Sequence, residues 1–132
     1  MVLLDTNAML WFWFGDARLG RNARRIIERA WQRGEAAVSA ISFWEFSMLR
    51  EKGRIAVLHD VASWRRTLLE EGLVEIAVDG EIGIRANELE NFHGDPADRL
   101  IVATALQGHR LVTSDRRILD WPGHLSRLDA TR

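Results

Sequence analysis

The chain has 132 residues, of which 47% are hydrophobic and 28% charged, as expected for one globular domain with a buried core. It contains no cysteine, which excludes disulfides, thiolate zinc sites and cysteine nucleophiles. A metal ion would be held by oxygen ligands or by one of four histidines, and carboxylates favour Mg²⁺ or Mn²⁺. The net charge of −1 argues against an extended basic surface for nucleic acid.

A local phosphate-binding surface is compatible with this charge, because arginine supplies 17 of the 18 basic residues and its planar fork suits phosphate. A GC-rich genome explains the arginine excess equally well. The opening MVLLDT lacks the features of a signal peptide, and the longest apolar run, 8–14, is too short to cross a bilayer. We therefore expect a cytosolic protein with no membrane segment.

Short apolar runs alternate with longer helical patterns along the chain, which is typical of βα units around a buried parallel sheet. In chain order, we expect a strand at 2–4, helices at 6–14 and 21–33, a strand at 36–40, helices at 42–51 and 61–71, a strand at 73–78, helices at 81–91 and from 96 to 106 or 107, a strand at 110–113, a short helix at 115–119 and a weak strand at 126–128. The pattern predicts an α/β protein.

Four acidic residues fall where strands end or the following helices begin. Asp5 and Asp115 each end a strand, whereas Glu45 and Asp98 each lie in the first turn of a predicted helix. In an open parallel sheet, ligands bind beyond the carboxyl ends of the strands, near the point where strand order reverses. The four carboxylates can therefore converge on one edge of the sheet.

Each acid taken alone also fits a helix cap, and Ser42 with Glu45 forms the S-x-x-E pattern of a capping box. Four carboxylates on one edge, however, would repel one another and raise their pKa values unless a cation neutralised them. Such a cluster is typical of a metal site. Hydrated Mg²⁺ held by carboxylates also suits phosphodiester chemistry.

The strings LLDTNAMLW, SFWEFSML, KGRI, GDPADRLIVATAL and LVTSD resemble, in this order, the motifs of PIN domains, especially the VapC toxins of bacterial toxin–antitoxin pairs. The segment D-P-x-D-R-x-I-x-A-x-A is the most specific part. The resemblance covers essentially the whole chain and implies a single PIN domain over residues 1–132. It implies a three-layer α/β/α fold with a central parallel sheet of four to five strands, a homodimer, an Mg²⁺ or Mn²⁺ cofactor, endonucleolytic cleavage of RNA and a small VapB-like antitoxin that blocks the active site.

The resemblance also implies a role for each acid. Asp5 and Asp98 would be the principal metal ligands, and Asp115 would complete the metal site directly or through water. Glu45 would position a water on the metal or act as the base.

Five further residues are weaker candidates for contact with nucleic acid. Thr113 and Ser114 stand where the family has a hydroxyl residue, which could hydrogen-bond a carboxylate or a phosphate. Asn7 is placed either to touch a ligand water or to start a helix. Arg99 and Arg116 each follow a proposed catalytic acid and could contact phosphate. Either could instead point to solvent, because adjacent helical residues do not share a face.

Other conspicuous residues receive structural interpretations. Asp95, before a proline, is interpreted as a helix cap rather than a ligand. The apolar stretch 10–14 is divided between the core and a dimer or antitoxin surface. Trp44 is another candidate for that surface, with core packing as the favoured role. The histidines lack metal-ligand spacing and are interpreted as ordinary surface residues; they are His59, His93, His109 and His124.

Three functional hypotheses follow. The first is a VapC-like ribonuclease toxin, and the second is a PIN-fold RNA-processing nuclease without an antitoxin. The third is a non-catalytic RNA- or protein-binding module of the same fold. The presence of all four acids counts against the third, and the short loops favour the first over the second.

Overall fold

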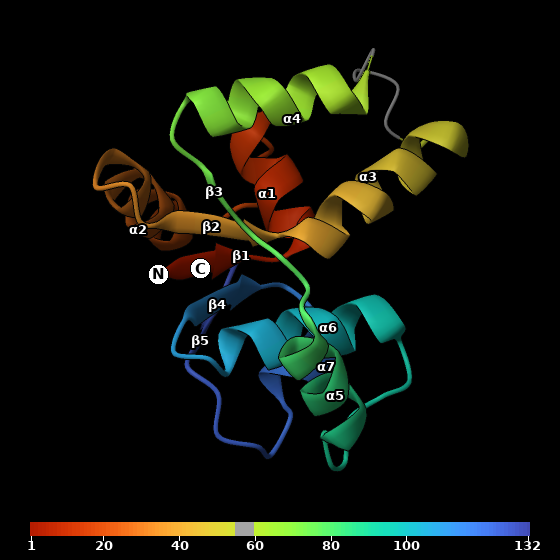
Figure 1. Cartoon of the computed structure of the whole chain (residues 1–132). Helices are drawn as coiled ribbons and strands as arrows, with labels where there is room; N and C mark the ends of the chain where they lie inside the picture. Colours follow the sequence, from red (N-terminus) through yellow and green to blue (C-terminus); the bar gives the residue numbers. More distant parts are fainter. Residues whose placement is uncertain (55–59) are drawn as a thin grey trace.

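A parallel sheet forms the centre of the computed structural model, which describes residues 1–54 and 60–132 (Figure 1). Its strands in the described residues are β1 (Val2–Leu4), β2 (Ala36–Ser39), β3 (Val74–Ile76), β4 (Arg110–Thr113) and β5 (Arg127–Asp129). They lie in the order β3-β2-β1-β4-β5, and every neighbouring pair is parallel. The chain builds outward from β1 to β3 and then resumes on the other side at β4, so strand order reverses between β1 and β4.

Helices cover both faces of this sheet (Figure 1). Those packed on one face are α1 (Thr6–Trp13), α2 (Arg21–Gln32), α3 (Ala40–Glu51) and α4 (Val61–Glu70); those on the other are α5 (Gly80–Glu88), α6 (Pro96–Ala105) and α7 (Arg116–Leu119). The expected three-layer α/β/α fold is confirmed. No helix in the described ranges is long and apolar enough to cross a membrane.

Each face of the sheet contributes side chains to its own apolar cluster, because successive side chains of a strand point to opposite faces. Leu4 and Val112 are buried with α1–α4, whereas Leu3 and Leu111 are buried with α6 and α7. Burial on both faces explains why the strands read as nearly continuous apolar runs rather than as alternating ones.

Helix α3 begins two residues earlier than expected. Ser39 is its N-cap, and the Ser39 hydroxyl accepts a hydrogen bond from the Ile41 N–H at 3.2 Å. Ser42 therefore lies buried inside the helix, and the predicted capping box of Ser42 and Glu45 is wrong. Glu45 falls in the second turn rather than the first, so its carboxylate is free to take part in a site.

One aromatic assignment is also wrong. Trp44 is 54% exposed, so the favoured core position is wrong and the alternative, a surface position, is the one observed. In the stretch 10–14, residues 10–13 pack partly buried against the core as expected, and Phe14 is 41% exposed. Its role as a dimer or antitoxin surface stays a prediction.

Candidate active site

All four predicted acids line one cavity of about 330 Å³: Asp5, Glu45, Asp98 and Asp115. Asp5 directly follows β1, and Asp115 follows β4 after one intervening residue. The cavity therefore lies where strand order reverses, which is the usual ligand position in an open α/β sheet. Glu45 reaches it from α3 and Asp98 from the first turn of α6.

Asp5 is both a helix cap and part of the cavity wall. Its backbone is extended, and one carboxylate oxygen accepts a hydrogen bond from the Ala8 N–H at 2.7 Å, capping α1. Burial raises the pKa of Asp5 to about 6, helped by the charges of Asp98 and Asp115 and opposed by hydrogen bonds from Thr113 and Ala8. Ionised Asp5 is thus costly to hold here without a cation.

Thr113, at the end of β4, connects two of the acids. Its hydroxyl hydrogen-bonds the Asp5 carboxylate and also accepts from the Asp115 N–H at 3.1 Å. Thr113 therefore contacts a carboxylate, one of the two contacts expected of it. Ser114 forms no side-chain hydrogen bond with residues 1–54 or 60–132. Asn7 lines the cavity and is exposed.

Glu45 is held by a chain of hydroxyls. The Thr6 hydroxyl donates a short hydrogen bond to Glu45 Oε1 and lies 3.0 Å from the Ser42 hydroxyl, which must then donate to Thr6. Burial raises the pKa of Glu45, and the neighbouring negative charges add to this effect. Sequence reasoning overlooked Thr6, although a hydroxyl residue directly after Asp5 was a visible signal.

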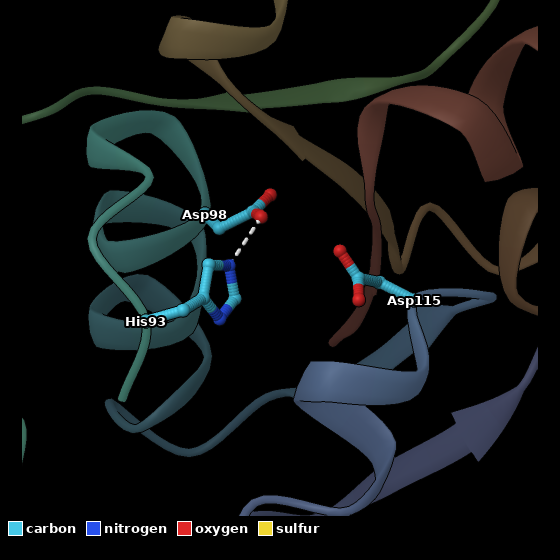
Figure 2. A group of neighbouring side chains, drawn as sticks. All are labelled: His93, Asp98 and Asp115. Carbon is cyan, nitrogen blue, oxygen red and sulfur yellow. Dashed lines mark hydrogen bonds and ion pairs between the residues drawn. The ribbon is translucent and has the colours of Figure 1, made fainter. Parts of the chain in front are cut away.

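His93 joins the acidic cluster (Figure 2). Its Nε2 lies 2.7 Å from Asp98 Oδ2, and because an ionised carboxylate can only accept, the imidazole donates. His93, Asp98 and Asp115 offer ligand atoms that all lie within 4.8 Å of one another. Burial raises the pKa of Asp98 even though the His93 hydrogen bond opposes it. The interpretation of His93 as an ordinary surface residue is therefore wrong.

The other histidines lie elsewhere. His109 Nδ1 is 3.1 Å from the amino group of Met1, and His124 is exposed. His59 falls outside the described residues.

The arginines are arranged differently from the prediction. Arg99 donates to four backbone carbonyl oxygens between residues 86 and 93, so it fastens that segment to α6 rather than facing substrate. Arg116 pairs with Asp120 at 3.0 Å and with Asp129 at 3.3 Å, and neither acid lines the cavity. Neither Arg99 nor Arg116 lines the cavity, and a phosphate contact by either arginine stays a prediction.

Arg117, which sequence reasoning passed over, reaches the site instead. Its Nη2 lies 2.9 Å from Asp115 Oδ2 and 3.5 Å from Asp98 Oδ2. Burial disfavours the charged form of Asp115, but the side chain and backbone N–H of Arg117 outweigh this and lower the Asp115 pKa. The doublet of arginines after Asp115 was the available signal, but the choice between them depends on the rotation of α7.

The donor set fits a divalent metal ion. It consists of carboxylate oxygens and one imidazole nitrogen, which hard and borderline divalent cations accept. Burial, and to a smaller extent the neighbouring negative charges, raises the pKa values of Asp5, Glu45 and Asp98. A bound cation would offset both effects, since it favours the ionised form of a carboxylate. The cluster can therefore bind such an ion.

Comparison with known proteins identifies the family of this chain. Residues 2–122 match the PIN domain. Over 119 residues the chain is 41% identical to Ribonuclease VapC22 of Mycobacterium tuberculosis, a match that covers 89% of this chain and 88% of that protein. The chain therefore belongs to the PIN-domain family, in its VapC group.

Two solved structures share the fold. One is a toxin–antitoxin complex from Klebsiella pneumoniae, with a TM-score of 0.66, 21% identity and coverage of 98% of both chains. The other is VapBC2 from Rickettsia felis bound to a DNA fragment from their promoter, with a TM-score of 0.67, 16% identity and coverage of 98% of this chain and 100% of that one. At these identities the likeness establishes the fold.

Proposed function

We propose that this protein is a metal-dependent endoribonuclease and the toxin of a toxin–antitoxin pair, with Mg²⁺ as its cofactor and Mn²⁺ as a substitute. The observation that carries the proposal is the convergence of four carboxylates in one cavity at the point where strand order reverses. The 41% identity to a protein named as a ribonuclease supports the reaction type.

Asp5, Asp98 and Asp115 would hold the ion, since they surround the cavity from β1, α6 and β4. When bound, a divalent cation polarises a phosphoryl oxygen, offsets the charge that develops in the transition state and lowers the pKa of a water molecule. Thr113 would keep two of these ligands in place through its paired hydrogen bonds. His93 would orient Asp98, as hydrogen-bonded neighbours of metal ligands commonly do.

Glu45 would act as the general base. Its raised pKa brings it nearer to the pH at which a base is both ionised and effective. The Thr6 hydroxyl fixes one carboxylate oxygen and leaves the other available to accept the proton of the attacking water. The water oxygen forms a bond to phosphorus as the bond from phosphorus to the leaving oxygen of the RNA breaks.

The proposed partners are RNA and a small VapB-like antitoxin that blocks the cavity, with the chain acting as a single-domain homodimer in the cytoplasm. The exposed aromatic side chains of Phe14 and Trp44 offer apolar surface for such protein contacts. Size-exclusion chromatography with light scattering tests the dimer.

Cleavage of end-labelled RNA by the purified protein, with Mg²⁺ or with EDTA, tests the activity. Asp98→Asn should lose about a hundredfold or more of the Mg²⁺-dependent rate, because removing a ligating or catalytic group typically costs several kcal/mol. Asp79→Asn is the matched control: Asp79 caps α5, does not line the cavity and keeps a capping oxygen as asparagine. Undiminished cleavage by Asp98→Asn would remove the proposed site.

Expression in bacterial cells separates toxin from housekeeping nuclease. A toxin should arrest growth, and co-expression of the small gene product encoded beside it should restore growth. Harmless expression of a nuclease-active protein would favour an RNA-processing role, and a folded protein that binds but never cuts RNA would favour a non-catalytic module.

A further inference from the structure

The cavity has a second, basic end. Helix α3 and its C-cap line it with Glu45, Met48, Leu49 and Lys52, and Arg54 lines it just beyond the C-cap. Spacings of three, four and seven residues place the four helical positions on one face. Over roughly 10 Å of helix, at 1.5 Å per residue, this face changes from acidic through apolar to basic. One wall of the cavity therefore leads from the acids to a cationic end.

The position of this basic end is set by a well-defined helix terminus. The Arg54 N–H donates to the Leu49 carbonyl at 2.9 Å, and the Gly53 N–H donates to the Arg50 carbonyl at 3.0 Å. These two hydrogen bonds are those of a Schellman motif, which requires the residue after the C-cap to adopt a left-handed backbone. Gly53 does so, with φ of +69°. The turn directs the chain so that Arg54 borders the cavity that Lys52 also lines.

Both cations are available for an external anion. Within residues 1–54 and 60–132, neither Lys52 nor Arg54 forms an ion pair or a side-chain hydrogen bond, and both are exposed. The arginines near the acids are engaged by contrast: Arg99 by backbone carbonyls, and Arg117 by Asp98 and Asp115. The two available charges thus stand at the far end of the cavity.

We propose that Lys52 and Arg54 form a subsite that binds a phosphate of the RNA backbone beside the scissile one. Met48 and Leu49 form an apolar floor for the sugar or base between the two phosphates. A span of about 10 Å corresponds to up to about three nucleotides of a stacked strand, at about 3.4 Å each, and to fewer of an extended one. The ammonium group supplies a point charge, and the guanidinium adds a two-pronged contact.

This subsite rests on the proposed ribonuclease function and deepens it. A purely local role for the same residues makes a different prediction. A basic residue at a helix C-terminus stabilises the helix dipole, so Lys52 would then affect unfolding and have no effect on RNA affinity. Salt dependence separates the two roles, because each phosphate contact to a single strand contributes about 0.7 to the slope of log K against log salt concentration.

The experiment uses a fluorescein-labelled single-stranded RNA of about 12 nucleotides, a length within the usual span of single-strand sites. This RNA carries 2′-O-methyl groups, which slow its cleavage. Fluorescence anisotropy at several salt concentrations is measured for wild type, Lys52→Ala, Arg54→Ala and the double variant. We expect each single variant to weaken binding about five- to tenfold and to lower the salt slope by about 0.7. Lys52→Arg, which keeps the charge, should restore most of the affinity.

Arg29→Ala is the matched control, since Arg29 is exposed on α2 and does not line the cavity; it should leave both affinity and slope at the wild-type values. In turnover of unmodified RNA, the loss should fall on KM rather than on kcat. The difference in KM between wild type and the double variant should narrow as the substrate is shortened to a dinucleotide. A dinucleotide cannot reach from the acids to Lys52 and Arg54.

The subsite is wrong if wild type cuts RNA and the folded double variant binds the labelled strand with unchanged affinity and salt slope. Thermal melting establishes that the double variant is folded. If the alanine substitutions disturb the end of α3, a second double variant with Lys52→Gln and Arg54→Gln replaces it. If wild type neither binds nor cuts RNA, the proposed function fails and the subsite fails with it, which is a distinguishable result.

Discussion

Replacing Asp5 by Asn should stabilise the metal-free protein while abolishing RNA cleavage. The pKa of Asp5 is about 6 in the folded state against 3.8 for an ordinary aspartate, a difference of 6 − 3.8 = 2.2. At about 1.36 kcal/mol per pKa unit, ionised Asp5 costs the folded state about 3 kcal/mol at neutral pH. Asparagine removes the charge and keeps an oxygen that can accept from the Ala8 N–H.

The sign of the pH dependence follows from proton binding. Between about pH 4 and pH 6 the folded protein holds a proton on Asp5 that the unfolded chain has already released. Wild-type stability from this group therefore falls as pH rises through that window. Asp5→Asn should show no such fall. The difference in free energy of unfolding between the two proteins should therefore grow from about 0.5 kcal/mol at pH 4 to about 3 kcal/mol above pH 7.

Urea unfolding in EDTA between pH 4 and pH 8 measures this difference. For 132 residues a change of about 3 kcal/mol corresponds to a rise in Tm of about 11 °C, since the unfolding entropy is about 2.1 cal/mol/K per residue. Glu28→Gln, a change of the same kind at an exposed position on α2, is the control and should leave stability nearly unchanged. The raised pKa of Asp5 would be refuted if the two proteins differed in free energy of unfolding by the same amount at pH 4 and pH 8. It would also be refuted if Asp5→Asn were less stable than wild type at pH 7. Added Mg²⁺ should stabilise wild type and have little effect on Asp5→Asn.

Three further outcomes are expected. Arg117→Ala should bind Mn²⁺ several-fold more tightly by calorimetry, because the guanidinium that pairs with Asp115 and Asp98 competes with the ion; equal or weaker binding would contradict this competition. His93→Ala should weaken Mn²⁺ binding about 10- to 100-fold by loss of the hydrogen bond to Asp98, whereas unchanged affinity would show that Asp98 needs no support. Ser39→Ala should cost about 1 kcal/mol in urea unfolding by loss of the α3 cap and leave Mn²⁺ affinity near that of wild type; unchanged stability would mean that the cap contributes nothing.

The sequence by itself was sufficient for the architecture. Strands buried on both faces must be continuous apolar runs, so β1 and β4 could be read at their observed bounds. Caps are formed by hydrogen bonds between residues two or three positions apart, so Asp95 before Pro96 could be assigned from neighbours alone. The convergence of the four acids followed from topology, because the carboxyl ends of parallel strands share one edge.

Only the tertiary structure decided which side chains face the cavity. Successive helical residues differ by about 100° around the axis, so a small error in where a helix begins or how it is rotated exchanges one neighbour for another. This is why Arg117 and not Arg116 reaches the acids, and why Ser42 lies inside α3 rather than capping it. Arg99 and His93 have roles other than the predicted ones for a related reason. The carbonyl partners of Arg99, and His93 itself, lie in the segment before α6, and the folded path of this segment cannot be read from composition. The sequence determined where the chemistry is located, and packing determined which residues carry it.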